Sequence, residues 1–188
     1  MGKNLTEKEF KKLIQKHIRN VDFVKVTIDD DCAIFGFLVK FSNDFVMIEE
    51  SNDFALAGTK IIPYNSIRSI RNNMYDKVSK AIYVSEKLIQ FNQDIINKTN
   101  LDNAEALFKS IKKQDFHCIV ESSKNKKDLF SIGEILEVKS KSVVINNYDP
   151  AGRINKKPHK ISFKNIDLIN FNDNYTKVFR KYLTQKNT

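Results

Sequence analysis

The chain has 188 residues, of which 41% are hydrophobic and 29% are charged, and its formal net charge at pH 7 is +9. This apolar content is enough for a packed core and excludes a disordered chain. The sequence contains neither an apolar run of about 20 residues that could span a bilayer nor an apolar leader, so we expect a cytoplasmic protein with no membrane partner.

The first half of the chain predicts a helix, a group of short strands and a second helix. Thr6 and Glu9 have the spacing of a capping box, and residues at helical spacing follow: Phe10, Leu13, Ile14 and His17. Runs rich in β-branched and aromatic residues then predict five strands, near residues 22–28, 32–41, 45–50, 58–63 and 67–70. A helix over 74–98 ends this half, with residues that face the strands: Val78, Ile82 and Leu88.

The second half predicts the same series of elements. Asp102 is the expected N-cap of a helix that carries Leu107, Phe108 and Ile111 on one face. Five strands are expected next, near residues 115–121, 129–139, 142–148, 158–163 and 166–171. A last helix over 172–184 should face these strands through three residues: Val178, Tyr182 and Leu183.

An internal repeat supports this division. Gly36 corresponds to Gly133 and Gly58 to Gly152, and a glycine inside a strand marks a bend or a close backbone approach. The motif Tyr75-Asp76-Lys77-Val78 corresponds to Tyr175-Thr176-Lys177-Val178. We therefore predict an α+β fold of two repeated units, residues 1–99 and 100–188. Each unit is a helix followed by a small five-stranded, strongly bent barrel and a further helix, and the units should dock through the helices 74–98 and 172–184.

The order of features in each half resembles an Sm-like barrel. Both halves carry a glycine in a long second strand, a tight turn, an apolar third strand, a second glycine and a closing I-x-x-I strand. The residues concerned are Gly36, 43–44, 45–48, Gly58 and 67–70, and Gly133, 140–141, 143–145, Gly152 and 166–169. The pattern covers about 50 residues of each half and is also similar to small uncharacterised bacterial proteins with such barrels.

The resemblance implies the fold and not the nucleotide pocket of the family. RNA-binding Sm-like proteins have Asp and Asn six and ten residues after the first glycine. This chain has Ser42 and Val46 at those places in the first half, and Lys139 and Val143 in the second. The basic residue that precedes the second glycine is replaced by alanine at positions 57 and 151. The uridine pocket is therefore not expected.

The titratable residues do not predict an enzyme. Cys32 and Cys118 have no CxxC spacing and are too few for a zinc cluster, so buried structural thiols are expected. His117 and Cys118 are neighbours in a predicted strand, and their side chains therefore point to opposite faces. No phosphate-binding loop, nucleophile elbow or zinc-protease motif is present, so we expect no catalytic residues, no cofactor and no metal site.

The positive charge is the main indication of a partner. Lysine outnumbers arginine 27 to 5, a profile that an AT-rich coding bias also produces, while phosphate and base recognition favours arginine. Residues 21–73 carry a net charge of −3 and residues 114–171 carry +3. The first hairpin tip of one half is Asp29-Asp30-Asp31, whereas its counterpart is basic. The candidate polyanion-binding residues are Lys124, Lys126, Lys127, Arg153, Lys156, Lys157 and Lys160.

Two functions follow from these observations. The first is a non-enzymatic module that binds nucleic acid, RNA above all, through the basic loops of the second half, with Phe41, Tyr148 and Phe163 available to stack on bases. The alternative is a protein-interaction module, such as an adaptor or an immunity-type protein that blocks a partner. Docking of the acidic loop of one copy on the basic loop of another would make a homodimer.

Overall fold

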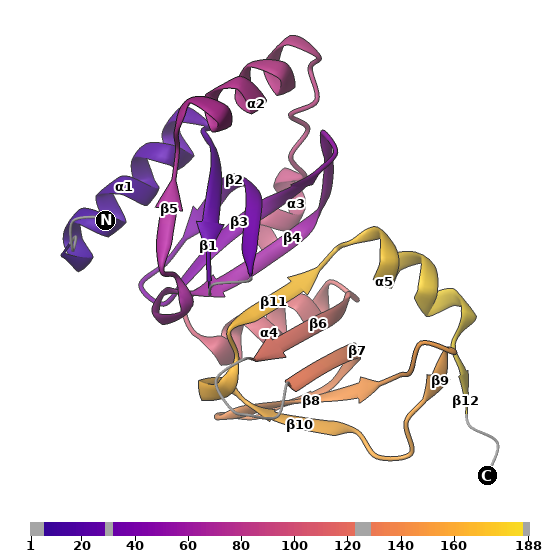
Figure 1. Cartoon of the computed structure of the whole chain (residues 1–188). Helices are drawn as coiled ribbons and strands as arrows, with labels where there is room; N and C mark the ends of the chain where they lie inside the picture. The colour runs from indigo at the N-terminus through magenta and orange to yellow at the C-terminus, as the bar shows by residue number, and fades with distance from the viewer. Residues whose placement is uncertain (1–5, 29–31, 123–128, 186–188) are drawn as a thin grey trace.

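One antiparallel sheet of ten strands runs through both halves of the chain (Figure 1). The computed structural model describes residues 6–28, 32–122 and 129–185. The strands of the first half are β1 (Phe23–Thr27), β2 (Ala33–Phe41), β3 (Phe45–Asn52), β4 (Ala55–Pro63) and β5 (Ser69–Arg71). Those of the second half are β6 (His117–Ser122), β7 (Leu129–Val138), β8 (Ser142–Asn147), β10 (His159–Ser162) and β11 (Leu168–Phe171).

The strand order corrects the predicted architecture. The sheet has the order β10-β8-β7-β6-β11-β4-β3-β2-β1-β5 and is not closed, so the prediction of two repeated units, each with its own small Sm-like barrel, is wrong. The halves are joined where β11 pairs with β4, with Ile169 opposite Ile61. The backbone hydrogen bonds between β4 and β11 therefore join the two halves, instead of closing a separate barrel in each half. The boundary between residues 99 and 100 stays a prediction, as does the resemblance to Sm-like proteins.

In the part of the chain that the structure describes, five helices lie around the sheet. They are α1 (Glu7–Asn20), α2 (Met74–Ser85), α3 (Gln93–Lys98), α4 (Ala104–Lys113) and α5 (Asn174–Phe179). Short 3₁₀ turns occur at η1 (Tyr64–Ser66), η2 (Phe163–Asn165) and η3 (Arg180–Tyr182), and β9 (Arg153–Ile154) pairs with β12 (Thr184–Gln185) in a small parallel sheet. None of the helices described is long and apolar enough to cross a membrane.

The helix boundaries confirm the predicted cap at Thr6 and correct the one at Asp102. The helix predicted over 172–184 is also shorter than expected, since α5 ends at Phe179 and Thr184 belongs to β12. Thr6 caps α1, since its hydroxyl accepts from the Glu9 N–H and the Glu9 carboxylate accepts from the Thr6 N–H. The cap of α4 is Asn103 and not its neighbour Asp102. The helix predicted over 74–98 is interrupted, because Lys87 adopts a left-handed conformation (φ 56°) after α2. The residues that follow pack on Phe37 and Tyr83 instead of continuing the helix.

One of the two predicted pairs of glycine bends is present in both halves, whereas Gly58 lies inside β4 with a φ of 140° and Gly152 lies outside any strand with a φ of 77°. Gly36 in β2 and Gly133 in β7 have nearly the same backbone conformation, with φ of 156° and 157°. Each lies two residues before a register shift in its strand, at Leu38/Lys40 in β2 and at Ile135/Glu137 in β7. The repeated sequence pattern therefore marks a repeated local bend, although the ten strands share one sheet.

The largest apolar cluster lies between the two halves. It combines Phe45, Met47 and Ile61 of the first half with a larger set from the second half: Leu107, Phe108, Ile111, Val120, Ile145 and Phe171. The short helix α3 also packs into this cluster through Ile95 and Ile96. The halves are thus joined by strand pairing and this shared core. Of the helices predicted to dock the halves, 74–98 and 172–184, the segment that forms α3 takes part in the core.

Candidate interaction surfaces

The basic residues predicted in the second half are placed only in part. Lys124, Lys126 and Lys127, like the acidic tip 29–31, lie outside the described residues. Arg153 is paired with Asp149, with 2.9 Å between Nε and Oδ2. Three lysines of the β9–β10 segment are exposed, and the described residues offer them no ion pair: Lys156, Lys157 and Lys160. Their role in binding a polyanion stays a prediction.

A second basic surface lies on α1, which the sequence-based choice of site residues left out. The helix packs on β2 and buries Ile14 and His17. Its opposite side carries residues spaced by 4, 3 and 4 positions, which therefore form one stripe: Lys8, Lys12, Gln15 and Arg19. All four are exposed. The sequence does contain a sign of this surface, because Lys8, Lys12 and Arg19 recur at helical spacing.

The carboxylates of α1 are already engaged within the helix. Glu7 accepts from Lys11 at 2.6 Å, and Glu9 closes the capping box with Thr6. Hydrogen bonding to these donors lowers the pKa of both carboxyl groups. Among the described residues, none forms a hydrogen bond or ion pair with Lys8, Lys12 or Arg19, although the charge of Lys12 contributes to the lowered pKa of Glu9.

A hollow of about 480 Å³ lies beside this basic stripe. It is lined by Glu7, Lys8, Lys11, Lys12, Gln15 and Phe41. Lys11 is held at the hollow by Glu7 and by the Asn43 side-chain oxygen, at 3.2 Å. Phe41, at the end of β2, is the single aromatic residue of the lining and is half-buried. Basic and aromatic side chains therefore converge at one concave place.

The other two aromatic residues proposed for stacking are differently placed. Tyr148 is only 3% exposed, and its ring stacks on Phe179 with centroids 5.5 Å apart. Phe163 stacks on Phe108 of α4 at 5.5 Å and is half-buried. Both rings therefore stack on aromatic neighbours inside the protein. Phe41 also packs against the core of the first half, but it lines the hollow beside Lys8 and Lys12 as well.

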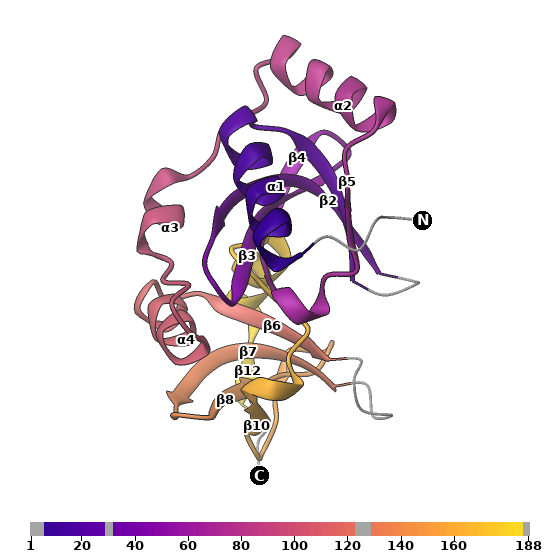
Figure 2. The same ribbon diagram turned by 90° about the vertical axis from the view of Figure 1, so that its left-hand side faces the viewer.

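The two basic surfaces are separate. Figure 1 shows α1 against the first half, at the upper left, while β9 and β10 lie at the far end of the second half. Figure 2, turned by 90°, again places α1 on the first half and β10 at the opposite end of the molecule. One short anion cannot contact both surfaces, so they can be tested independently.

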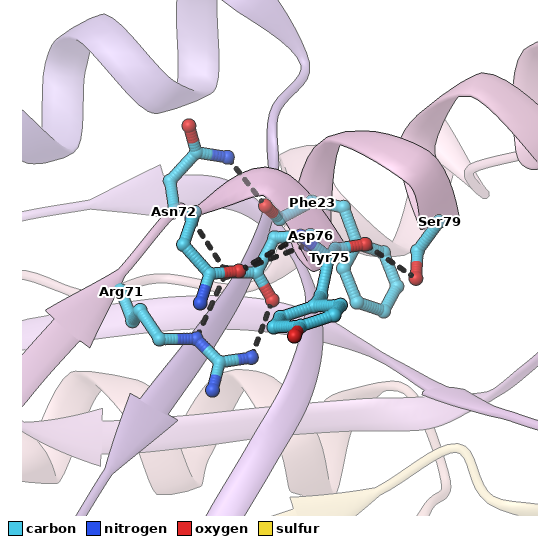
Figure 3. Close-up of polar contacts among 7 residues, drawn as sticks. Phe23, Arg71, Asn72, Tyr75, Asp76 and Ser79 are labelled. Carbon is cyan, nitrogen blue, oxygen red and sulfur yellow. Dashed lines mark hydrogen bonds and ion pairs between the residues drawn. The ribbon is translucent and has the colours of Figure 1, made fainter.

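A third surface is formed by α2, whose start is tightly fixed. Arg71 of β5 donates from Nε and one terminal nitrogen to the Asp76 carboxylate, at 3.0 and 2.8 Å (Figure 3). Asn73 caps the helix and its N–H donates to Asp76, while Asn72 donates to the Phe23 carbonyl of β1. Burial raises the pKa of Asp76, but the hydrogen bonds from Arg71 and the Asn73 N–H, together with the charge of Arg71, lower it by more, so the pKa lies below its usual value.

The outward side of α2 is apolar and exposed. Val78 is 55% exposed and Ile82 is 36% exposed, so the prediction that these residues face the strands is wrong, whereas Leu88 does pack on the core. The matching residues of the second half show the same error, with Val178 55% and Tyr182 70% exposed. Helical spacing of apolar residues predicts a packing face, but here nothing in the described chain covers it.

Two buried polar side chains lie near each other, His117 at the start of β6 and Tyr148 directly after β8, with ring centroids 5.9 Å apart. The Nδ1 atom of His117 and the hydroxyl of Tyr148 are buried without a hydrogen-bond partner in the described structure. Burial lowers the pKa of His117 to about 4, which the nearby Arg180 reinforces and Asp115 opposes. Burial also raises the pKa of the adjacent Cys118 thiol to about 12, so this thiol is protonated at neutral pH and is not an activated nucleophile.

Acid is expected to destabilise the fold through His117. Its pKa rises from about 4 in the folded chain to the ordinary 6.5 on unfolding, so the unfolded chain binds the extra proton between these values. Stability should fall as the pH drops from 6.5 to 4, by about 2–3 kcal/mol from this residue. Urea unfolding across this range measures the loss.

The variant His117→Phe should flatten the pH dependence in that window. His159→Gln is the control, because His159 is half-buried and bonded to the Ser131 hydroxyl at 2.9 Å. An unchanged slope in His117→Phe would show that another group causes the acid sensitivity.

The described residues contain no group of three or more His, Cys, Asp or Glu side chains arranged to hold a metal ion. Comparison of the chain with models of known protein families, with curated proteins and with solved structures gives no match.

Proposed function

We propose that this chain is a non-enzymatic module that binds single-stranded nucleic acid, RNA above all, at the α1 surface. The observation that supports the proposal is the hollow in which Lys8, Lys12 and Gln15 of α1 meet Phe41 of β2. Proteins that bind single strands combine a positively charged groove, which follows the phosphates, with an aromatic ring on which a base stacks. The α1 surface has both parts at one place.

The charges suit a flexible polyanion. Successive outward residues of α1 lie about 5 to 6 Å apart along the helix, so the stripe from Lys8 to Arg19 extends over roughly 16 Å. Lys16 is exposed beside the stripe and adds a further cation. Because long lysine side chains adapt to different backbone positions, the surface favours a flexible strand over a rigid, sequence-specific partner.

The apolar side of α1 argues against a lipid surface. Ile14 is fully buried, and Phe10 and Ile18 pack on the core of the first half. A helix that inserts into a membrane interface exposes an apolar face, and α1 has none to offer. The ligand of this helix is therefore one that is recognised by charge and by stacking on Phe41.

The binding of a labelled single-stranded RNA of mixed sequence, titrated at several salt concentrations, tests the proposal. Four cations predict a slope of about −3 for log K against log salt. The variant Lys8→Ala/Lys12→Ala should reduce the slope to about −1.5 and weaken binding on the order of tenfold at low salt. Phe41→Leu keeps an apolar side chain but removes stacking, and should weaken binding by about tenfold with the slope unchanged.

The matched control is Lys156→Ala/Lys157→Ala, which removes the same charge from the β9–β10 segment. Binding that is lost in this control and kept in the α1 variant would assign the nucleic acid to the second half. Absence of RNA binding at low salt would contradict the proposal.

The second candidate function, a protein-interaction adaptor, is favoured by the exposed Tyr175, Val178 and Tyr182. It predicts that one protein partner is recovered after nuclease treatment and is lost in Val178→Lys.

A further inference from the structure

The helix α2 has two unlike sides, and only one of them is used within the chain. Asp76 and Tyr83 are buried against the sheet. The residues diametrically opposite are spaced by 4, 3 and 4 positions and are all exposed: Met74, Val78, Ala81 and Ser85. This spacing is the heptad pattern of a helix that packs along its length on another helix.

The position of α2 leaves this stripe accessible. Figures 1 and 2 both show α2 at one end of the molecule, with no other labelled element beyond it. Its start is held by the Arg71–Asp76 pair and its last turn by Tyr83, so the helix presents the stripe on a fixed support. A partner can therefore reach the outward side without any rearrangement of the sheet.

The stripe changes in size along the helix. Met74 and Val78 are bulky and lie in the first half of α2, whereas Ala81 and Ser85 are small and lie in the second half. Two copies that cross in opposite directions about a two-fold axis place Met74 opposite Ser85, and Val78 opposite Ala81. Bulky side chains then meet small ones at every contact, which is the condition for close packing.

We propose that α2 is a homodimer contact, in which the outward stripes of two copies pair antiparallel about a two-fold axis. The flanks agree with this arrangement. On one flank Tyr75, 70% exposed, lies next to Ile82 of the second copy. On the other flank the stem of Lys77 lies next to Val84, which is 58% exposed.

The charges of α2 are compatible with a second copy. The stripe itself contains no charged side chain, so it does not suit a polyanion. The one carboxylate of α2, Asp76, points inward to Arg71, which leaves no acidic group that would oppose a second copy across the axis. The shorter helix α5 exposes Tyr175 and Val178 but has only six residues, too few for a second stripe.

Sedimentation velocity of the nuclease-treated full chain over a wide concentration range tests the dimer. A contact of about three helical turns is small, so we expect a weak, concentration-dependent dimer. Val78→Lys should give a monomer at all concentrations and keep the same unfolding midpoint, because Val78 is exposed. Val178→Lys is the matched control, with an equally exposed valine in the corresponding motif of α5, and should dimerise like the parent chain.

A charge pair tests the direction of the helices. In Val78→Lys/Ala81→Glu the antiparallel arrangement sets each new lysine opposite the new glutamate of the other copy, so dimerisation should return. A parallel pair would set like charges together and stay monomeric. A parent chain that is monomeric throughout, a dimer that survives Val78→Lys, or a double variant that remains monomeric would each overturn the proposal.

Discussion

Replacing Gly36 by alanine is expected to lower the free energy of unfolding by about 3 kcal/mol or more. Gly36 has a φ of 156°, a conformation that L-residues rarely adopt, and a Cβ atom there would overlap the carbonyl oxygen of Glu49 on the neighbouring strand β3. This oxygen belongs to a paired strand and cannot move without breaking the ladder. The substitution therefore strains the bend of β2 and the pairing of β3 together.

The same loss is expected for Gly133→Ala, because its Cβ atom would overlap the Asn146 carbonyl oxygen in the same way. Ser69→Ala on the exposed edge strand β5 is the control and should change stability by no more than about 0.5 kcal/mol. Urea unfolding followed by circular dichroism measures all three. A loss below about 1 kcal/mol for either glycine would show that the bend can relax.

Local features of this fold could be predicted from the sequence because their causes lie within a few residues. The Thr6–Glu9 capping box involves a single helical turn, and the bend at Gly36 reflects the missing side chain of one residue. The strand positions followed from runs of β-branched residues. Each of these signals is complete in a short stretch of sequence.

Strand partners could not be predicted in the same way. The pairing of β11 with β4 brings Ile169 to Ile61, residues far apart along the chain. Periodicity shows that a segment is a strand with one buried face, but it does not name the neighbour. A series of strands that closes on itself and one that continues into the next half have the same local pattern, and for this reason two barrels were expected where one open sheet is present.

The candidate surfaces show a similar limit. Phe41 was predicted to stack on a base, which stays a prediction, and the lysines beside it belong to α1 and come together with β2 only in the folded chain. The apolar stripe of α2 was recognised as a packing face, but its spacing does not distinguish the protein's own core from a second copy. The net charge of each segment drew attention to the basic loops of the second half, and the regular basic face of α1 was therefore missed.

Tyr83→Ala is expected to remove the support of α2 and, with it, the dimer. The Tyr83 side chain is fully buried and contacts Phe37 edge-on with ring centroids 5.0 Å apart, and its hydroxyl lies 2.6 Å from the Ser51 hydroxyl. Truncation of a buried aromatic residue costs about 3–5 kcal/mol through lost contacts and the cavity that remains. Since Tyr83 is the one large side chain that α2 buries, the loss should free the helix before the sheet unfolds.

Tyr83→Phe separates this effect from the hydroxyl contact, since it keeps the ring and removes only the bond to Ser51, a loss of about 1 kcal/mol. Hydrogen exchange of the α2 amides, urea unfolding and sedimentation velocity together measure the outcome. In Tyr83→Ala the α2 amides should exchange faster than those of β3 and the chain should be monomeric, whereas Tyr83→Phe should keep both protection and dimer. Val78→Lys is expected to abolish the dimer without loosening α2, so a Tyr83→Ala chain that still dimerises would show that the contact does not depend on a fixed helix.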